Sequence, residues 1–255
     1  MILKLVITGA SGVLGHALVV ALLAKGYEVV AITSHPDILR QKFDITLPLV
    51  CCGWSDFLSE RIDLKDIDVV IHCAFARNQN CRELARSMEL SEKLFRWVIS
   101  NDVPAIINIS SQSIYGEMRK TPSKETDEVD PQDAYALVKL ACERLGAIIT
   151  EGTSSKFTSI RLASLIGPQF EERFVNKMLR DAVQTGEISV IGGQQVFSFM
   201  DIRDAVSGIL MMLNVDYLHW KPIYNLGSEE SYSIVEIAYL IANFLLLKTG
   251  KRINV

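Results

Sequence analysis

The sequence predicts an α/β fold in which helices cover both faces of a doubly wound parallel sheet. Short runs rich in β-branched residues alternate along the chain with stretches of helical periodicity, an order that indicates strand–helix–strand units. Several strand-like runs, such as the one from Asp68 to Ala74, are apolar on both faces, which is typical of a parallel sheet buried between helices. A glycine-rich turn also joins the first strand-like run to a helical pattern.

The first two thirds of the chain alternate regularly between the two kinds of element. Strands are predicted over Leu3–Thr8, Glu28–Thr33, Val69–Cys73, Ala105–Ser110 and Thr158–Leu162. Helices are predicted over Gly15–Lys25, Glu83–Asn101 and Ala134–Thr150. The polar segment Met118–Asp133 contains two prolines and several acidic residues, so we expect a surface loop there.

The pattern loosens after Gly167-Pro168. The expected elements are a helix near Glu171–Thr185, a short strand near Ile188–Ile191, a strand over Phe197–Ile202 and a helix over Arg203–Leu213. We therefore divide the chain into a larger domain over residues 1–167 and a smaller region over residues 168–255. The smaller region is expected to interleave with the first and to return partly to the sheet.

Composition argues against several classes of protein. Of the 255 residues, 49% are hydrophobic and 22% are charged, which suits a large buried core. The net charge of −4, without a block of lysine and arginine, argues against a nucleic-acid partner. No apolar stretch approaches the ~20 residues that span a bilayer, and Thr8-Gly9 interrupts the apolar N-terminus. We expect a soluble, cytoplasmic protein without a membrane partner.

The cysteines are odd in number and lack the paired spacing of metal ligands, so we predict no metal site. We expect reduced thiols, buried as small hydrophobic residues in an intracellular protein. The five are Cys51, Cys52, Cys73, Cys81 and Cys142.

The glycine-rich turn has the spacing Gly-x-x-Gly-x-x-Gly at Gly9, Gly12 and Gly15. Glycine permits a tight turn and a close approach of backbone to pyrophosphate, while the N–H groups at the helix start carry partial positive charge. This context predicts a Rossmann-type dinucleotide site; a strand-to-helix turn without a ligand is the alternative. The turn residues expected to contact the dinucleotide are Gly9, Ser11, Gly12, Val13, Leu14 and Gly15.

The end of the second predicted strand bears on the choice of cofactor. An NAD site usually has an acidic residue there to bind the ribose 2′-hydroxyl, but this sequence offers Thr33. Ser34, His35 and Arg40 could bind a 2′-phosphate instead, or could be solvated loop residues. We expect NADP or NAD as cofactor, with NADP slightly favoured.

A tyrosine and a lysine four residues apart, Tyr135 and Lys139, share one face of the predicted helix. A free tyrosine titrates near pH ~10, so a proton shuttle at neutral pH needs a nearby cation to stabilise the phenolate. Lys139 and an oxidised nicotinamide could both supply that charge. The spacing alone is weak evidence, but its order after the glycine turn and the serine-rich strand end around Ser110 makes it specific.

With these motifs the sequence resembles the extended short-chain dehydrogenase/reductase family, in its group of nucleotide-sugar epimerases and dehydratases. The resemblance covers nearly the whole chain. It is carried by Thr8-Gly9-x-x-Gly12-x-x-Gly15, Val70–Ala74, Ser110-Ser111-x-x-Ile114-Tyr115-Gly116, Tyr135-x-x-x-Lys139, Arg161-Leu162 leading to Gly167-Pro168, and Tyr224–Gly227.

The resemblance implies roles for individual residues. Tyr135 would be the general acid/base, Lys139 would hold the nicotinamide ribose and lower the tyrosine pKa, and Ser111 would bond the reacting substrate oxygen. Arg161 would either steady the nucleotide or cap a strand edge, and His72 would be a packed strand residue. Further cofactor contacts are implied for Cys73, Ala74, Phe75, Ile109 and Leu162, and further substrate contacts for Gln112, Ser113 and Phe197.

Two departures from the family pattern bear on the substrate. Gln112-Ser113 stands where dehydratases of the family carry an Asp-Glu pair, which disfavours elimination of water. Phe197 stands where an arginine often clamps the sugar-nucleotide phosphate, and a phenyl ring cannot replace that bidentate donor. The chain also ends where relatives continue, so the substrate region is either naturally reduced or shortened in this sequence.

Three functional hypotheses follow. The first is an NAD(P)-dependent epimerase or reductase of a nucleotide-linked sugar, the second an NADP-dependent reductase of a smaller carbonyl compound, and the third a non-catalytic dinucleotide-sensing protein. The resemblance also implies a homodimer formed through the helices over Glu83–Asn101 and Ala134–Thr150. Their apolar residues, such as Leu94 and Leu137, would serve either a partner subunit or the sheet beneath.

Overall fold

The computed structural model describes residues 2–59, 61–77, 80–116, 122–170 and 173–255. The chain divides into two compact units. Unit 1 comprises Met1–Leu162 and Arg203–Leu226, and unit 2 comprises Ala163–Ile202 and Gly227–Val255. The segment Arg203–Leu226 therefore belongs to unit 1, although it lies within the smaller region predicted from the sequence.

Unit 1 contains a seven-stranded sheet in which every pair of neighbouring strands is parallel. The strands, in spatial order, are β3 (Leu49–Cys52), β2 (Glu28–Ile32), β1 (Lys4–Thr8), β4 (Val69–His72), β5 (Ala105–Ser111), β6 (Lys156–Leu162) and β9 (Ile223–Leu226). The chain runs outward from β1 to β3 and then crosses to β4 on the other side of β1. The sheet therefore has a topological switch point between β1 and β4, where open α/β sheets bind ligands at the carboxyl ends of their strands.

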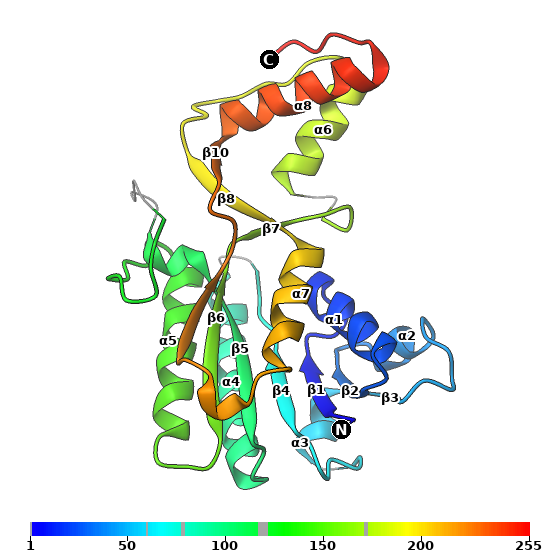
Figure 1. The fold of residues 1–255 in the computed structure, drawn as a ribbon, viewed down its shortest axis with the longest axis vertical. Coiled ribbons are helices and arrows are strands. Elements are labelled where there is room, and N and C mark those ends of the chain that lie inside the picture. Colours follow the sequence, from blue (N-terminus) through cyan, green and yellow to red (C-terminus); the bar gives the residue numbers. More distant parts are fainter. Residues whose placement is uncertain (1, 60, 78–79, 117–121, 171–172) are drawn as a thin grey trace. The chain divides into compact units, whose positions relative to one another are not determined.

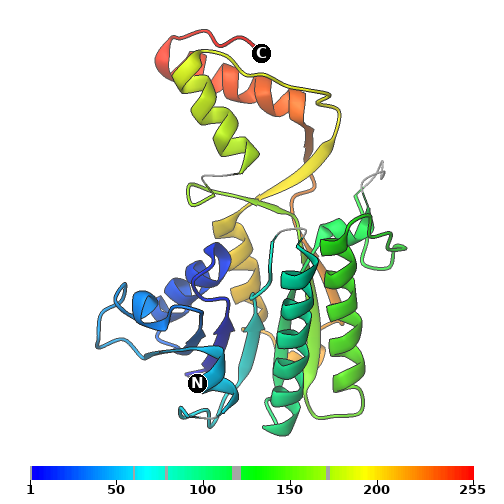
Figure 2. The same ribbon diagram turned by 180° about the vertical axis from the view of Figure 1, so that it is seen from behind.

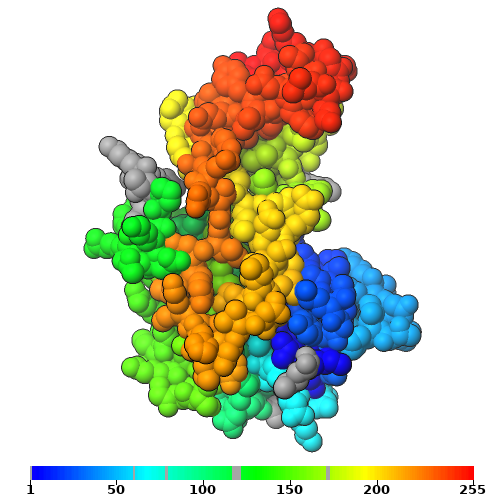
Figure 3. Space-filling model, viewed as in Figure 1, coloured from blue at the N-terminus to red at the C-terminus, as the bar shows by residue number. Residues whose placement is uncertain are grey.

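Helices cover both faces of this sheet, as predicted. They are α1 (Val13–Ala24), α2 (Pro36–Arg40), α3 (Trp54–Leu58), α4 (Cys81–Ser100), α5 (Ala134–Thr150) and α7 (Ile202–Met212), with the short 3-10 helices η1 (Gln112–Tyr115) and η2 (Tyr217–His219). In Figure 1, α1 and α7 lie in front of the sheet, and Figure 2 shows α4 and α5 in front of the opposite face. Figure 3 shows α7 beside α1 at the surface of unit 1.

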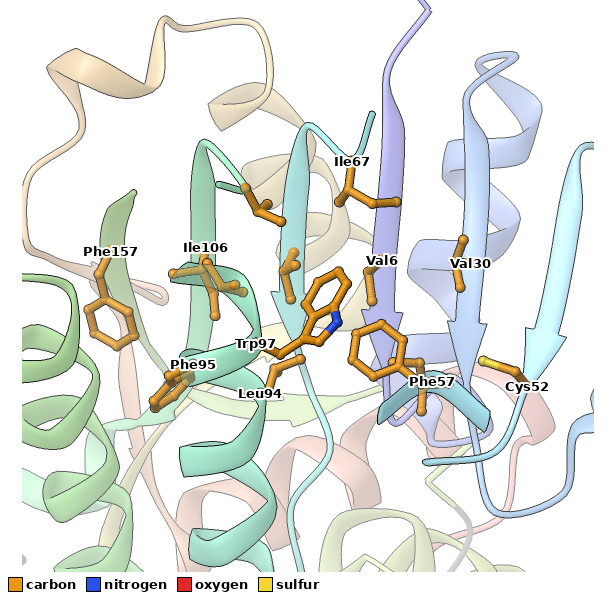
Figure 4. Packing of buried hydrophobic residues seen from close by; sticks show 14 residues of the cluster. Val6, Val30, Cys52, Phe57, Ile67, Leu94, Phe95, Trp97, Ile106 and Phe157 are labelled. Atoms are coloured by element: carbon orange, nitrogen blue, oxygen red, sulfur yellow. The ribbon is translucent and has the colours of Figure 1, made fainter. Parts of the chain in front are cut away.

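A continuous apolar core fills the layer between the sheet and the helices α3 and α4 (Figure 4). Figure 4 shows Val6 beside the rings of Trp97 and Phe57, and Ile106 near Phe95, which is fully buried on α4. The rings of Phe57 on α3 and Trp97 on α4 lie 4.4 Å apart, centroid to centroid. Side chains alternate along a strand, so neighbours of Val6 point to the other face, and burial on both faces explains the continuously apolar strands.

Unit 2 is smaller and has its own sheet and core. Its elements are β7 (Ser164–Ile166), α6 (Phe174–Thr185), β8 (Val196–Asp201), β10 (Ser231–Ser233) and α8 (Ile234–Thr249). β8 pairs in parallel with β7 and antiparallel with β10. α8 begins with a capping box, in which Ser233 and Glu236 satisfy each other's backbone N–H groups.

The predicted α/β fold and its doubly wound sheet are confirmed, and the five predicted strands and three predicted helices of the first two thirds agree within about two residues. The strand near Ile188–Ile191 is wrong, because only Glu187 makes an isolated bridge, to Asn254. The strands and α-helices that were not predicted are β3, α2, α3, β7, β9, β10 and α8. Residues 122–133 of the expected surface loop form no helix or strand, and residues 117–121 lie outside the described part of the chain, as do Glu171 and Glu172.

Two further expectations concern cysteines and membranes. None of the five cysteines forms a disulfide, but Cys81 is exposed, contrary to the expected burial. Across the residues that the structure describes, no helix combines the length and apolar character that a membrane crossing requires.

Candidate active site

The predicted site residues of unit 1 gather at the carboxyl ends of the parallel strands and on α5. The turn from Gly9 to Gly15 follows β1, Thr33 and Ser34 follow β2, Cys73, Ala74 and Phe75 follow β4, and Leu162 ends β6. Ile109 and Ser111 lie in β5, Gln112 and Ser113 in η1, and Tyr135 and Lys139 on α5. Phe197 lies in β8 of unit 2.

The glycine turn passes so close to neighbouring backbone that two of its glycines cannot carry a side chain. Gly9 has a φ of 67°, and a Cβ on it would lie 2.7 Å from the backbone nitrogen of Ala74. A Cβ on Gly15 would lie 2.3 Å from the carbonyl oxygen of Gly9. The absence of side chains therefore lets the turn pack against the loop after β4, at the switch point of the sheet.

The start of α1 fits a phosphate group. The N–H of His16 donates to the carbonyl of Gly12 at 2.8 Å, so the helix is regular from its first turn. Gly12 is its N-cap and supplies no side-chain bond to the first N–H groups of the helix. Ser11 and Gly12 are exposed. Uncapped N–H groups at an exposed helix start attract anions, so this turn suits a dinucleotide pyrophosphate.

At the end of β2, Ser34 and His35 are exposed and their contact with a 2′-phosphate stays a prediction, whereas Thr33 and Arg40 have other contacts. Thr33 is buried, and its hydroxyl accepts the N–H of His35 at 3.2 Å. The guanidinium of Arg40 donates to three backbone carbonyls, those of Phe43 at 3.3 Å, Asp44 at 3.0 Å and Ile45 at 2.9 Å. Arg40 therefore holds its own loop together, and the slight preference for NADP loses its main candidate residue.

His72 connects the glycine turn to α4 through buried hydrogen bonds. Its Nδ1 lies 2.7 Å from the Thr8 hydroxyl, which also accepts the N–H of Ala74 at 3.1 Å. Its Nε2 lies 2.8 Å from the hydroxyl of Ser91, which donates to the carbonyl of Ser87. Because the Ser91 proton is used, Nε2 carries the ring proton and Nδ1 accepts from Thr8. Burial, together with the charge on Lys139, lowers the pKa of His72 to about 3.

Lys139 lies buried at the end of β5. Its Nζ donates to the carbonyl oxygen of Ile109 at 2.7 Å and lies 3.8 Å from the centre of the Phe75 ring, a cation–π contact. Burial lowers the pKa of Lys139 to about 8, and the thiols of Cys142 and Cys73 oppose that shift. The ammonium is therefore mostly protonated at pH 7 but loses its proton more readily than a surface lysine.

Tyr135 lies beside this ammonium. Its ring centre is 5.9 Å from the Nζ of Lys139 and 5.8 Å from the centre of the Phe75 ring, which it meets edge to face. Asp133 caps α5 by accepting the N–H of Ala136 at 2.7 Å, so Tyr135 stands in the first turn of the helix. Tyr135 and Phe75 are half-buried, so the tyrosine is reachable from solvent while its cation is not.

Ser111 ends β5 and caps η1. Its Oγ accepts the backbone N–H of Ser113 at 3.2 Å and the hydroxyl of Ser113 at 2.9 Å. Ser111 pairs with Leu162 across the sheet, two residues beyond the carbonyl of Ile109 that receives Lys139. With two donors directed at its oxygen, Ser111 can donate its own proton to a ligand.

Arg161, on β6, takes part in a buried hydrogen-bond network with Glu143, Tyr115 and Asn225. Its Nη2 lies 2.8 Å from Oε2 of Glu143, with both side chains under 5% exposed, and its Nη1 donates to the Tyr115 hydroxyl at 2.7 Å. That hydroxyl donates to Oδ1 of Asn225 at 2.8 Å. Of the two roles implied for Arg161, steadying the nucleotide or capping a strand edge, these contacts support the structural one.

Phe197 belongs to an aromatic cluster within unit 2. Its ring centre lies 5.5 Å from that of Phe174 and 5.9 Å from that of Phe199. The substrate contact implied for Phe197 stays a prediction.

Sequence reasoning missed the connecting groups of the site rather than its central ones. Ser91 and Glu143 had no signal in the sequence, because both sit at ordinary positions of helices and meet their partners only in the folded sheet. Asn225 was quoted within a motif, but without a role.

Comparison with known proteins identifies relatives along the whole chain. The model of the NAD dependent epimerase/dehydratase family matches residues 5–227. The dTDP-4-dehydro-6-deoxy-D-allose reductase of a Streptomyces species is 27% identical over 261 residues, which are 92% of this chain and 79% of the relative. The UDP-glucose 4-epimerase of Lactobacillus helveticus is 23% identical over 264 residues, 92% of this chain and 79% of the relative.

Solved structures agree in fold. The UDP-glucuronic acid 4-epimerase of Bacillus cereus, in complex with UDP-glucuronic acid and NAD, has a TM-score of 0.83 at 22% identity, over 99% of this chain and 85% of that one. The UDP-N-acetylglucosamine 4-epimerase of the same species has a TM-score of 0.80 at 21% identity, with the same coverage. The predicted enzyme class is confirmed by these relatives. The chain belongs to the NAD dependent epimerase/dehydratase family.

Proposed function

We propose that this enzyme is an NAD-dependent epimerase or reductase that acts on a nucleotide-linked sugar, with Tyr135 as general acid/base. The observation that carries the proposal is the buried ammonium of Lys139, fixed by the Ile109 carbonyl beside the reachable ring of Tyr135. A buried cation next to a tyrosine favours its phenolate and so makes proton transfer possible near neutral pH.

The residues present fit a dinucleotide. The uncapped start of α1 and the side-chain-free cradle at Gly9 and Gly15 would hold its pyrophosphate, and Lys139 would hold the ribose next to the nicotinamide. When bound, NAD supplies the hydride acceptor and, in reduced form, the donor.

The protein side chains move and stabilise the proton. During oxidation of a sugar hydroxyl, the Tyr135 phenolate takes the hydroxyl proton as the carbon loses hydride, and in the reverse direction Tyr135 returns the proton to the carbonyl oxygen. Lys139 stabilises the phenolate between these steps. Ser111 donates a hydrogen bond to the reacting oxygen and so keeps it in line with Tyr135.

NAD is favoured over NADP within this proposal. Support comes from the carbonyl contacts of Arg40 and from the burial of Thr33, because neither leaves a charged donor for a 2′-phosphate. The relative solved with NAD points the same way. Titration calorimetry should give a lower Kd for NAD than for NADP, and tighter binding of NADP would overturn this part of the proposal.

A second candidate is a reductase of a smaller carbonyl compound without a diphosphate. The observation that favours it is the aromatic cluster of Phe174, Phe197 and Phe199, where an arginine would be expected to meet the diphosphate. Aromatic rings offer apolar contact and stacking in place of charge.

The test combines cofactor and substrate panels with two tyrosine variants. Purified protein is mixed with NAD, NADH, NADP or NADPH and with UDP- and dTDP-linked sugars and their 4-keto forms, and products are followed by chromatography and by absorbance at the reduced-nicotinamide band. An epimerase should turn over sugar without net change in that band, whereas a reductase should consume reduced cofactor in equal amount.

Tyr135→Phe should abolish turnover and retain NAD binding, whereas Tyr239→Phe, at an exposed position of α8, should behave as the wild type. Equal turnover by Tyr135→Phe, or no turnover of any nucleotide sugar by the wild type, would refute the main proposal. Turnover of simple aldehydes or ketones alone would favour the second candidate.

A further inference from the structure

A one-way chain of hydrogen bonds, which we call the Arg161 network, joins four side chains from α5, β6, η1 and β9 of unit 1. Its members are Glu143, Arg161, Tyr115 and Asn225. A guanidinium can only donate, so the Tyr115 hydroxyl must accept from Arg161 and give its proton to Oδ1 of Asn225. That fixes the side-chain amide of Asn225, whose Nδ2 then donates to the carbonyl of Ser123 at 2.8 Å.

Two members of the network lie next to residues of the candidate site, and a third reaches the segment over residues 122–125. Tyr115 is the last residue of η1, the helix that Ser111 caps. Glu143 lies one turn beyond Lys139 on α5, the helix that carries Tyr135. Asn225 reaches the segment after the undescribed residues, where its backbone N–H also donates to Oε1 of Glu125 at 2.9 Å.

The two halves of the network differ in strength. The Glu143–Arg161 pair has three contacts of 3.3 Å or less between guanidinium and carboxylate, and it is nearly inaccessible to water. The bond from Tyr115 to Asn225 instead joins two neutral groups, and Asn225 in turn donates to the carbonyl of Ser123 and to the carboxylate of Glu125. The ion pair therefore fixes the guanidinium of Arg161. Tyr115 links this guanidinium to η1 and, through Asn225, to the 122–125 segment.

We propose that Tyr115 and Asn225 are positioning residues that hold Ser111 and the 122–125 segment in place for the substrate. The cofactor side does not use them, since their contacts lie on η1, β6, β9 and this segment, whereas the pyrophosphate cradle lies on β1, α1 and the loop after β4. The part of this inference that concerns turnover rests on the proposed function; the part that concerns local order does not.

The decisive comparison uses two tyrosine-to-phenylalanine variants. Tyr115→Phe removes only the hydroxyl that links Arg161 to Asn225. Tyr224→Phe is the matched control, because Tyr224 is the neighbour of Asn225 on β9 and its hydroxyl accepts the local N–H of Lys221 at 2.9 Å, with no other hydrogen-bond partner among residues 2–59, 61–77, 80–116, 122–170 and 173–255. Asn225→Ala is a third variant, which releases Ser123 but leaves the contact between Arg161 and Tyr115 intact.

Hydrogen exchange followed by mass spectrometry tests local order without a substrate. Tyr115→Phe should speed exchange about tenfold over residues 111–116 and 122–125, as expected for the loss of one to two net hydrogen bonds. Asn225→Ala should speed it over 122–125 alone, and Tyr224→Phe over neither. Unchanged exchange in Tyr115→Phe, or an equal effect of Tyr224→Phe, would overturn the inference.

Binding and kinetics then separate positioning from general damage. NAD affinity should stay within about twofold of the wild type in Tyr115→Phe, while kcat/KM for the nucleotide sugar should fall about tenfold. A matching loss of NAD affinity would show general damage and would contradict the proposal. If Tyr115→Phe fails to fold, Asn225→Ala decides by the same two measurements. If the wild type turns over no nucleotide sugar, the proposed function fails, while the exchange results still decide this inference.

Discussion

Acidification to pH 5 should destabilise the protein through His72, a buried imidazole on β4. Its pKa in the folded state is about 3, because burial and the charge of Lys139 disfavour the imidazolium. In the unfolded chain the pKa returns to about 6.5. As the pH falls through 6.5, the unfolded chain therefore binds a proton that the native protein refuses, and the free energy of unfolding decreases.

The size of this effect follows from the two pKa values. At pH 5 the unfolded imidazole lies 1.5 pH units below its pKa of about 6.5, and the native imidazole is still neutral. At about 1.4 kcal/mol per unit, His72 should remove about 2 kcal/mol of stability between pH 7.5 and pH 5. This figure does not depend on the native value as long as that value stays below about 4. The remaining destabilisation appears only between pH 5 and pH 3.

Urea unfolding at pH 7.5 and pH 5 measures the loss, with comparable m-values required of each variant. His72→Gln should be less stable than the wild type at pH 7.5, since it breaks the bonds to Thr8 and Ser91, but its further loss on acidification should be about 2 kcal/mol smaller. His219→Gln, at an exposed position of η2, should retain the wild-type loss.

Two results would refute this reasoning. One is an equal loss of stability between pH 7.5 and pH 5 in the wild type and in His72→Gln. The other comes from the wild type alone: an NMR titration in which the His72 ring signals shift with a midpoint above pH 5 would mean that burial does not hold the imidazole neutral.

Three further predictions concern backbone fit, packing and assembly. Gly15→Ala should raise the Kd for NAD at least tenfold by calorimetry, since its Cβ would lie 2.3 Å from backbone. Gly53→Ala, whose Cβ contacts are 3.8 Å or longer, should leave the Kd unchanged. Equal binding of NAD by the two variants would contradict the role of the glycine turn in holding the pyrophosphate. Gly146→Ala should cost about 1–3 kcal/mol in urea unfolding, because its Cβ would lie 2.2 Å from the Phe157 ring, and an unchanged midpoint would show that the ring can move away. We also propose a homodimer through the outer faces of α4 and α5, for which light scattering should give twice the chain mass. Leu137→Asp, at a position 57% exposed, should reduce the measured mass to that of one chain. A monomeric wild type would contradict the proposal.

The expected dimer helices illustrate how a residue type can serve two purposes. Leu94 was named from its apolar character, and it is fully buried with Phe95 and Val98 in the core beneath α4. Leu137 faces outward instead. Periodicity identifies an apolar helix face, but the sequence does not state which layer of the protein will cover it.

The central residues of the site were predictable because their signals are local. The glycine spacing at Gly9, Gly12 and Gly15 and the four-residue spacing of Tyr135 and Lys139 express the geometry of one turn and of one helix. Each signal lies within about seven residues of sequence. The fold brings these two local motifs to the same edge of the sheet through the order of its parallel strands.

The strands that were missed or wrongly predicted depend on partners distant in sequence. β3 has four residues and forms only by pairing with β2, and the segment near Ile188–Ile191 has β-branched residues but no partner strand. The role of Arg40 depends on the carbonyls that its own loop presents. Arg161 meets Glu143 18 residues away and Tyr115 46 residues away, and no local pattern encodes either meeting.

The interrupted path of unit 1 has a consequence for how the chain can fold. β9 completes the sheet by pairing with β6, yet about 60 residues separate the two strands and most of them belong to unit 2. Until Ile223–Leu226 leaves the ribosome, β6 is an unprotected sheet edge, and the amide of Asn225 is missing from its place next to Tyr115. A fragment that stops near residue 167 would keep the glycine turn, Tyr135 and Lys139, but it would expose that edge and should aggregate rather than bind cofactor.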